Sequence, residues 1–156
     1  MRYWLMKSEP DEVSFDDVLS APGRTVAWFG VRNYQARNFM RDAMAVGDGV
    51  LFYHSSCAVP GVAGLAEIAS GPYPDASQFD PKSHYHDPKA TEEQPRWISV
   101  DVRATEAGRY LPLSELRTVA ALEGMVLLQK GSRLSISPVA KGEWDAVVAL
   151  VRGKGA

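Results

Sequence analysis

The sequence lacks most of the features that mark secreted and membrane proteins. It has one cysteine, Cys57, among 156 residues, so no internal disulfide can form and a reducing compartment is favoured. No apolar run approaches the ~18 residues of a membrane span. The amino end shows no charged-then-apolar signal pattern. We therefore expect a cytoplasmic protein with no membrane partner.

The sequence also lacks a strong excess of charge of either sign. The formal net charge is -2, with 23% charged and 46% hydrophobic residues. Indiscriminate coating of DNA needs many lysine and arginine contacts to phosphate, so this composition argues against it. No glycine-rich phosphate motif of the Walker or Rossmann kind is present. The length suits one ordinary globular core, and we expect a single domain over residues 1–156.

Hydrophobic patterning predicts a mixed fold. Apolar or alternating runs predict six short strands, at 3–7, 26–29, 50–54, 62–68, 96–102 and 125–128. Helical spacing predicts helices at 15–19, where Ser14 and Asp17 resemble a capping pair, and at 33–45, 113–122 and 144–151. Sequential hairpins, without regular strand–helix alternation, indicate an α+β domain around a small barrel-like sheet. The segment 71–95 holds five prolines together with aromatic and histidine residues, which favours an ordered lid.

The segment 28–38 is the most informative part of the chain. It sets Trp28, Tyr34 and several amides beside Arg32 and Arg37, and no acidic residue occurs between Asp17 and Asp42. Aromatic faces stack on nucleobases, amides read base edges, and guanidinium groups bind phosphate. The same pattern also fits aromatic residues buried in the core at the start of a helix whose arginines face water.

Five motifs in collinear order resemble the EVE domain family of the PUA-like superfamily. They are Trp4-Leu5-Met6-Lys7-Ser8-Glu9-Pro10, the segment 28–37, Gly47-Asp48 before Phe52-Tyr53-His54-Ser55, Tyr85-His86-Asp87-Pro88-Lys89, and Gly131-Ser132-Arg133-Leu134-Ser135 with Pro138-Val139. The resemblance covers residues 3–150. It implies a PUA-like pseudo-barrel with flanking helices, related to YTH and ASCH domains, and a pocket for a modified base in DNA or RNA. One departure is Ala140, where the family often has Ser or Thr at the start of the last helix.

The resemblance, together with the chemistry of the side chains, suggests a binding site. We expect Trp28 and Tyr85 to form the two stacking walls. The residues expected in the base pocket are Lys7, Ser8, Trp28, Gly30, Val31, Asn33, Tyr34, His54, Ser55, Tyr85, Leu134 and Ser135. Those expected to hold phosphates are Arg32, Arg37 and Arg133. We expect a non-catalytic reader that needs no metal or cofactor; the sequence leaves the oligomeric state open.

Two other classes of function remain compatible with the sequence. A small enzyme acting on nucleotides or RNA could use His54, His84 and His86 as metal ligands. It could instead pair His54 with the thiol of Cys57. Neither pattern has the spacing of a known site. A protein-interaction module whose cleft binds an acidic ligand is the third possibility.

Overall fold

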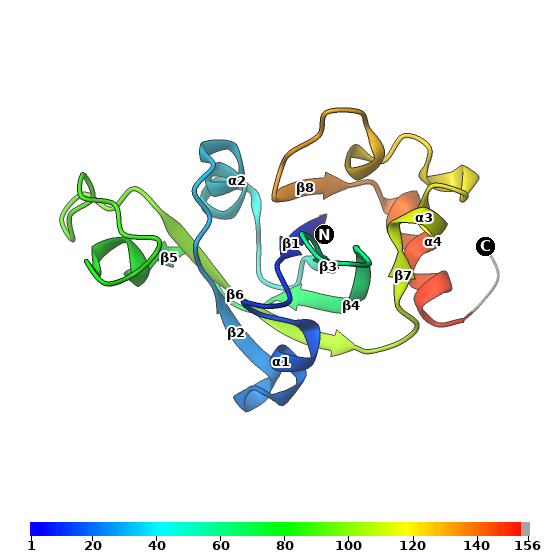
Figure 1. Ribbon diagram of the computed structural model, residues 1–156, viewed down its shortest axis with the longest axis horizontal. Coiled ribbons are helices and arrows are strands. Elements are labelled where there is room, and N and C mark those ends of the chain that lie inside the picture. Colours follow the sequence, from blue (N-terminus) through cyan, green and yellow to red (C-terminus); the bar gives the residue numbers. More distant parts are fainter. Residues whose placement is uncertain (154–156) are drawn as a thin grey trace.

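A computed structural model describes residues 1–153, and its centre is an eight-stranded mixed sheet (Figure 1). The main strands lie in the order β2-β6-β4-β3-β1-β8, with β5 paired to β6 and β7 paired to β4. The strand bounds are β1 Tyr3–Ser8, β2 Thr25–Trp28, β3 Gly49–His54, β4 Gly61–Ile68, β5 Tyr73–Pro74, β6 Ile98–Glu106, β7 Leu111–Pro112 and β8 Ile136–Val139. Strands β1 and β3 run parallel, whereas the other pairs are antiparallel. The α+β class is therefore confirmed, although the sheet has more strands than predicted and is not a closed barrel.

The helices that flank the sheet are short. They are α1 Phe15–Ser20, η1 Pro22–Arg24, α2 Tyr34–Asn38, η2 Phe39–Ala43, η3 Ala76–Phe79, α3 Leu113–Leu116, η4 Ala120–Leu122, η5 Val126–Leu128 and α4 Lys141–Val151. Helix α1 begins as predicted: the Ser14 hydroxyl accepts a hydrogen bond from the Asp17 N–H, and the Asp17 carboxylate accepts one from the Ser14 N–H. At α4 the Glu143 carboxylate accepts from the Ala140 N–H, so the helix begins without a side-chain cap at Ala140. Across residues 1–153, no helix is long and apolar enough to cross a membrane.

The two central strands are buried on both faces. In β1, Trp4 and Met6 join one apolar cluster, and Leu5 between them joins another. In β3, Phe52 joins the first cluster and Leu51 joins the second. Successive side chains of a strand point to opposite faces. A continuous apolar run in β1 and β3 therefore supplies two cores.

A buried carboxylate holds the turn that leads into β3. Asp48 accepts hydrogen bonds from the backbone N–H groups of Arg2 and Ala45 and from the indole N–H of Trp4, at 3.0–3.1 Å. The helix predicted for 33–45 ends just before this turn. Its second half, η2, is a π turn in which the Met44 N–H reaches the Phe39 carbonyl at 2.9 Å. Asp48 therefore connects the end of this helical segment, at Ala45, to the first strand, at Trp4.

Near the carboxyl end, two predictions from hydrophobic patterning were wrong and one strand was missed. The predicted strand 125–128 is instead the 3-10 turn η5, Val126–Leu128, and the predicted helix 113–122 consists of α3 and the separate turn η4. A short apolar run does not distinguish a buried turn from a strand. The strand β8 was missed because it is four residues long and contains Pro138, whose exposed position suits the edge of a sheet.

Candidate nucleic-acid interface

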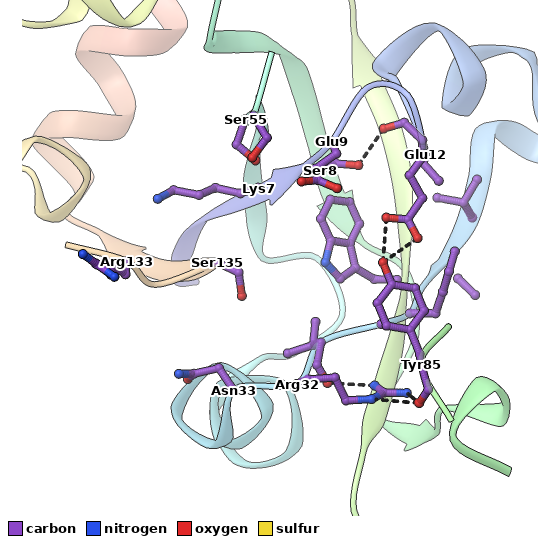
Figure 2. A pocket seen from close by; sticks show the side chains of 18 residues that line it. Lys7, Ser8, Glu9, Glu12, Arg32, Asn33, Ser55, Tyr85, Arg133 and Ser135 are labelled. Carbon is purple, nitrogen blue, oxygen red and sulfur yellow. Dashed lines mark hydrogen bonds between the residues drawn. The ribbon is translucent and has the colours of Figure 1, made fainter. Parts of the chain in front are cut away.

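A cavity of about 520 Å³ opens where the parallel strands β1 and β3 end. Because Ser8 pairs with His54, the carboxyl ends of both strands meet at one edge of the sheet. The turn after β2, the loop 129–135 and the lid residue Tyr85 complete the walls (Figure 2). The residues predicted for the site that line this cavity are Lys7, Ser8, Trp28, Gly30, Val31, Arg32, Asn33, Ser55, Tyr85, Arg133 and Ser135. Segments far apart in the sequence thus converge on one space large enough for a base.

Trp28, the last residue of β2, belongs both to the core and to the cavity wall. Its side chain is 7% exposed and lies edge-on to Phe52, with ring centroids 5.3 Å apart. It also lines the cavity. Trp28 is therefore a core residue that also reaches the cavity, and the stacking of a base on its ring stays a prediction.

The turn after Trp28 depends on a glycine. Gly30 has φ +80°, a left-handed conformation that suits glycine. The ring of Tyr85 lies directly over it, and a Cβ at this position would lie 2.7 Å from Cζ of Tyr85. The Gly30 N–H donates to the buried carboxylate of Asp75 at 2.7 Å. This glycine lets the lid pack directly on the backbone of the turn.

Tyr85 closes one side of the cavity. Its ring lies edge-on to Phe29 at 5.8 Å, and its hydroxyl donates to the carboxylate of Glu12, whose oxygens lie 2.6 and 2.7 Å away (Figure 2). Burial and the neighbouring Glu12 raise the pKa of Tyr85 to about 12. The phenol therefore stays protonated at neutral pH and acts as a donor.

Arg32 is placed differently from the prediction that it would hold a phosphate. Its guanidinium group donates to the carbonyl oxygens of Tyr85 and Val31, the carboxylate of Asp75 and the hydroxyl of Ser77, at 2.7–3.2 Å. A guanidinium has five N–H donors, and these five contacts occupy them. Arg32 therefore holds the lid against the turn and has no donor left for a phosphate.

Two buried polar side chains that sequence reasoning missed hold the lid in place. Asp75 is 1% exposed and also accepts from the N–H and hydroxyl of Ser77. Gln78 is fully buried: its amide donates to the carbonyls of Asp75 and Trp97 and accepts from the N–H groups of Arg96 and Trp97. These bonds confirm that segment 71–95 is ordered. The one available sequence signal was Asp75 two residues before Ser77, a spacing typical of a helix cap.

Four predicted site residues lie outside the cavity lining. Tyr34 stacks on Trp97 at 4.8 Å, and Arg37 lies over the Tyr34 ring and donates to the Arg96 carbonyl. Both brace the base of the lid. His54 accepts a hydrogen bond from the Phe15 N–H through Nε2, and burial lowers the pKa of its imidazole. Leu134 is also absent from the lining.

The cavity is electrically polar. Lys7 and Arg133 lie on one side, and Glu9 and Glu12 lie on the other (Figure 2). Burial lowers the pKa of Lys7. The two glutamates were missed as lining residues, although Glu9 directly follows the predicted Lys7-Ser8 pair. An anionic group entering the cavity is therefore drawn toward the Lys7 side.

The three histidines are not assembled as the enzyme hypothesis requires. His54 lies beside Phe15, whereas His84 packs edge-on against Tyr85 at 5.1 Å. Across residues 1–153, no three histidine, cysteine, aspartate or glutamate side chains are grouped so that they could hold a metal ion. Within the same range, no hydrogen bond joins His54 to Cys57.

Comparison with known proteins identifies the family. The sequence model of the EVE domain family matches residues 2–150. The chain belongs to the EVE domain family. Human thymocyte nuclear protein 1 is 42% identical, over 95% of this chain and 73% of that protein. A crystal structure of a Pseudomonas syringae protein is 50% identical with a TM-score of 0.89, covering 95% of this chain and 98% of that one. The crystal structure of human THYN1 in complex with DNA containing 5-methylcytosine is 42% identical with a TM-score of 0.88, over 96% of this chain and 97% of that chain.

Proposed function

We propose that this EVE domain is a non-catalytic reader of DNA, in which a modified base such as 5-methylcytosine enters the cavity between Trp28 and Tyr85. The observation that carries the proposal is this aromatic cavity, in a chain 42% identical to human THYN1, whose crystal structure contains 5-methylcytosine DNA. Stacking of a base on an aromatic side chain contributes about 1–3 kcal/mol. Two such walls supply most of the affinity for the base.

Polar groups around the cavity suit the edge of a base. The side-chain oxygen of Asn33 accepts from the Ala36 N–H at the start of α2, which leaves its amide nitrogen as a donor. The Ser8 hydroxyl donates to the Val13 carbonyl at 2.6 Å, so toward a ligand it can only accept. These contacts fix which groups are available: Asn33 donates, and Ser8 accepts. A base carrying both an acceptor and a donor on its edge satisfies both residues.

The chemistry of the lining favours binding over catalysis. No histidine or cysteine lines the cavity in the described part of the chain, and the Glu12 carboxylate is engaged by the Tyr85 hydroxyl. A nucleophile with an adjacent base is the usual arrangement for hydrolysis. In the described residues the lining therefore holds no histidine that could activate one of its serines, which supports a reader.

The decisive experiment compares oligonucleotides that differ in one base. Cytosine, 5-methylcytosine and 5-hydroxymethylcytosine are placed at the centre of otherwise identical single-stranded DNA, duplex DNA and RNA, and the dissociation constants are measured. An apolar contact to one added group is worth about 1–3 kcal/mol, so we expect a roughly 10- to 200-fold preference for a modified base. Flipping a base out of a duplex costs a few kcal/mol, so single strands should bind more tightly than duplexes.

The outcomes are distinct. Equal affinity for modified and unmodified DNA would contradict the proposed reader function. A preference seen only with RNA would mean that the domain reads modified RNA and not modified DNA. Tyr85→Ala tests the cavity directly, because it removes the aromatic wall that the lid contributes. Preference for the modified base should fall in this variant if the cavity is the site of recognition.

A further inference from the structure

A second cavity of about 510 Å³ adjoins the base cavity. The two share Lys7, Ser55 and Ser56, so these residues form the partition between them. The far side of the second cavity is formed by the start of α3, by η5 and by the turn 129–132. A ligand that fills the base cavity can therefore continue past Lys7 into a neighbouring space.

The second cavity is cationic. Lys7, Arg117 and Lys130 line it, and no aspartate or glutamate does so in residues 1–153. In that same part of the chain, none of these three, nor Arg133 at the adjoining cavity, forms an ion pair with a carboxylate. Many other cations on the surface do form such pairs, as the bonds of Arg103 to Glu67 and of Arg152 to Glu106 show. Three cations without a carboxylate partner thus line this cavity, and Arg133 lies at the adjoining one, on the side away from Glu9 and Glu12 (Figure 2).

The backbone around this cavity is unusual at two points. Ser56, in the partition, has φ +53°, a conformation that costs a non-glycine residue energy. Gly131, in the opposite wall, has φ +80° within a turn closed by the Ser132 N–H and the Gln129 carbonyl. Glycine adopts this φ without strain. The strained conformation of Ser56 persists only where the surrounding structure enforces it, and such strain is found often at binding sites.

We propose that the second cavity binds the phosphodiester that links the nucleotide carrying the modified base to the next nucleotide of the same strand. Lys7 lies between the two cavities, and Arg117 and Lys130 hold the phosphate beyond it. The acidic side chains at the opposite end of the base cavity repel phosphate, so the strand leaves on the Lys7 side. The inference rests on the proposed reader function and adds to it a second subsite, which makes the ligand a dinucleotide unit.

The test separates the base from its neighbour. The probes are the nucleoside 5-methyl-2′-deoxycytidine and a short single-stranded oligonucleotide with one central 5-methylcytosine. The variant Arg117→Ala/Lys130→Ala should bind the oligonucleotide roughly tenfold or more weakly at physiological salt. The slope of log affinity against log salt should become shallower by about 0.7, because one phosphate of a single strand is no longer neutralised. Binding of the nucleoside, followed by NMR shifts at Gly30 and Asn33, should not change.

Arg24→Ala/Lys82→Ala is the matched control, because it also removes two exposed cations that form no ion pair with a carboxylate in residues 1–153, and neither residue lines either cavity. It should leave both probes unaffected. In the wild-type protein, the oligonucleotide but not the nucleoside should shift the amide signals of Gly131 and Ser132.

Three results would overturn the proposal. An unchanged salt slope in the Arg117/Lys130 variant, with the wild type still selecting the modified base, rejects the second subsite and leaves the reader intact. Loss of nucleoside binding in that variant shows that these cations act on the base cavity itself. If the wild-type protein does not distinguish modified from unmodified oligonucleotide, the reader function fails, and the second subsite fails with it.

Discussion

The hydroxyl of Tyr85 and the carboxylate of Glu12 join two segments that are 73 residues apart. Glu12 lies in the loop after β1, and Tyr85 lies in the long segment between β5 and β6. The bond spans one side of the cavity and fixes the aromatic ring over Gly30 (Figure 2). A base that stacks on Tyr85 therefore meets a ring that is already in position.

This bond can be tested apart from the ring. Tyr85→Phe keeps the aromatic face and removes the hydroxyl, whereas Tyr85→Ala removes both. We expect Tyr85→Ala to weaken binding of 5-methylcytosine DNA by about 1–3 kcal/mol. Tyr85→Phe and Glu12→Gln should each have a smaller effect, because the stacking face remains. Titrations of the three variants check the order, and an equal loss in Tyr85→Phe and Tyr85→Ala would mean that binding depends on the hydroxyl and its bond to Glu12 and not on the aromatic face.

Trp28 requires a more conservative substitution than Tyr85 does. Its ring is buried against Phe52, so Trp28→Ala should lower the free energy of unfolding by about 3–5 kcal/mol. Loss of binding in that variant would not by itself identify a stacking wall. Trp28→Phe should retain more of the core, and its affinity should fall more than its stability does. Thermal melts beside the titrations distinguish the two, and unchanged affinity in a folded Trp28→Phe protein would remove Trp28 from the site.

Arg32 should act on the lid and not on salt-dependent DNA binding. Arg32→Ala leaves the buried Asp75 carboxylate without a charged donor, and hydrogen bonds to charged groups are worth about 1.5–3 kcal/mol each. In Arg32→Ala we expect faster proteolysis within residues 71–95. The slope of log affinity for DNA against log salt should not change. Arg32→Lys should not restore the resistance of this segment to proteolysis, because an ammonium group cannot replace the planar guanidinium group and its five donors. Arg24→Ala, an exposed cation outside the cavity lining, is the control; a shallower salt slope in Arg32→Ala would return Arg32 to the phosphate ligands.

His54 should make stability fall in mild acid. Its pKa is lowered, chiefly by burial, so the unfolded chain takes up a proton at a higher pH than the folded protein does. The contribution of His54 is therefore complete above about pH 6.5, the unperturbed value, and is lost as the pH falls through the folded pKa. Denaturant unfolding at several pH values between neutral and mildly acidic should show this loss in the wild type and in His84→Gln/His86→Gln. It should be weaker in His54→Gln, and the same acid sensitivity in that variant would assign it to other groups.

Local patterns in the sequence were sufficient for the elements that depend on local interactions. The Ser14–Asp17 pair marked the start of α1, and the apolar runs marked β1 and β3. The sequence also predicted that the residues around Trp28 and Gly30 line one cavity, because residues adjacent in the chain stay close together in a turn. The strand β8 could not be predicted, because its partner β1 lies more than 120 residues away and its own four residues carry little pattern.

The errors at the site have a common cause. An arginine beside aromatic residues has the same local sequence whether it faces a ligand or a buried acid. Arg32 meets Asp75, 43 residues further on, and that contact is made only by the fold. Glu12 was missed for the same reason, since its partner is Tyr85. Long-range polar pairs decide which side chains remain available to a ligand, and single-sequence patterns do not contain them.

The parallel pairing of β1 and β3 leaves part of the cavity wall to segments outside the paired strands. Both strands deliver the chain to the same rim, and the segments that follow them, 9–13 and 55–60, lie beyond the last paired residues. Together with residues of the turn 129–135, they form part of the cavity wall outside the paired positions of β1 and β3. We therefore expect the chemical group that the cavity accepts to change through substitutions in these segments, where a side chain can be replaced without altering either central strand.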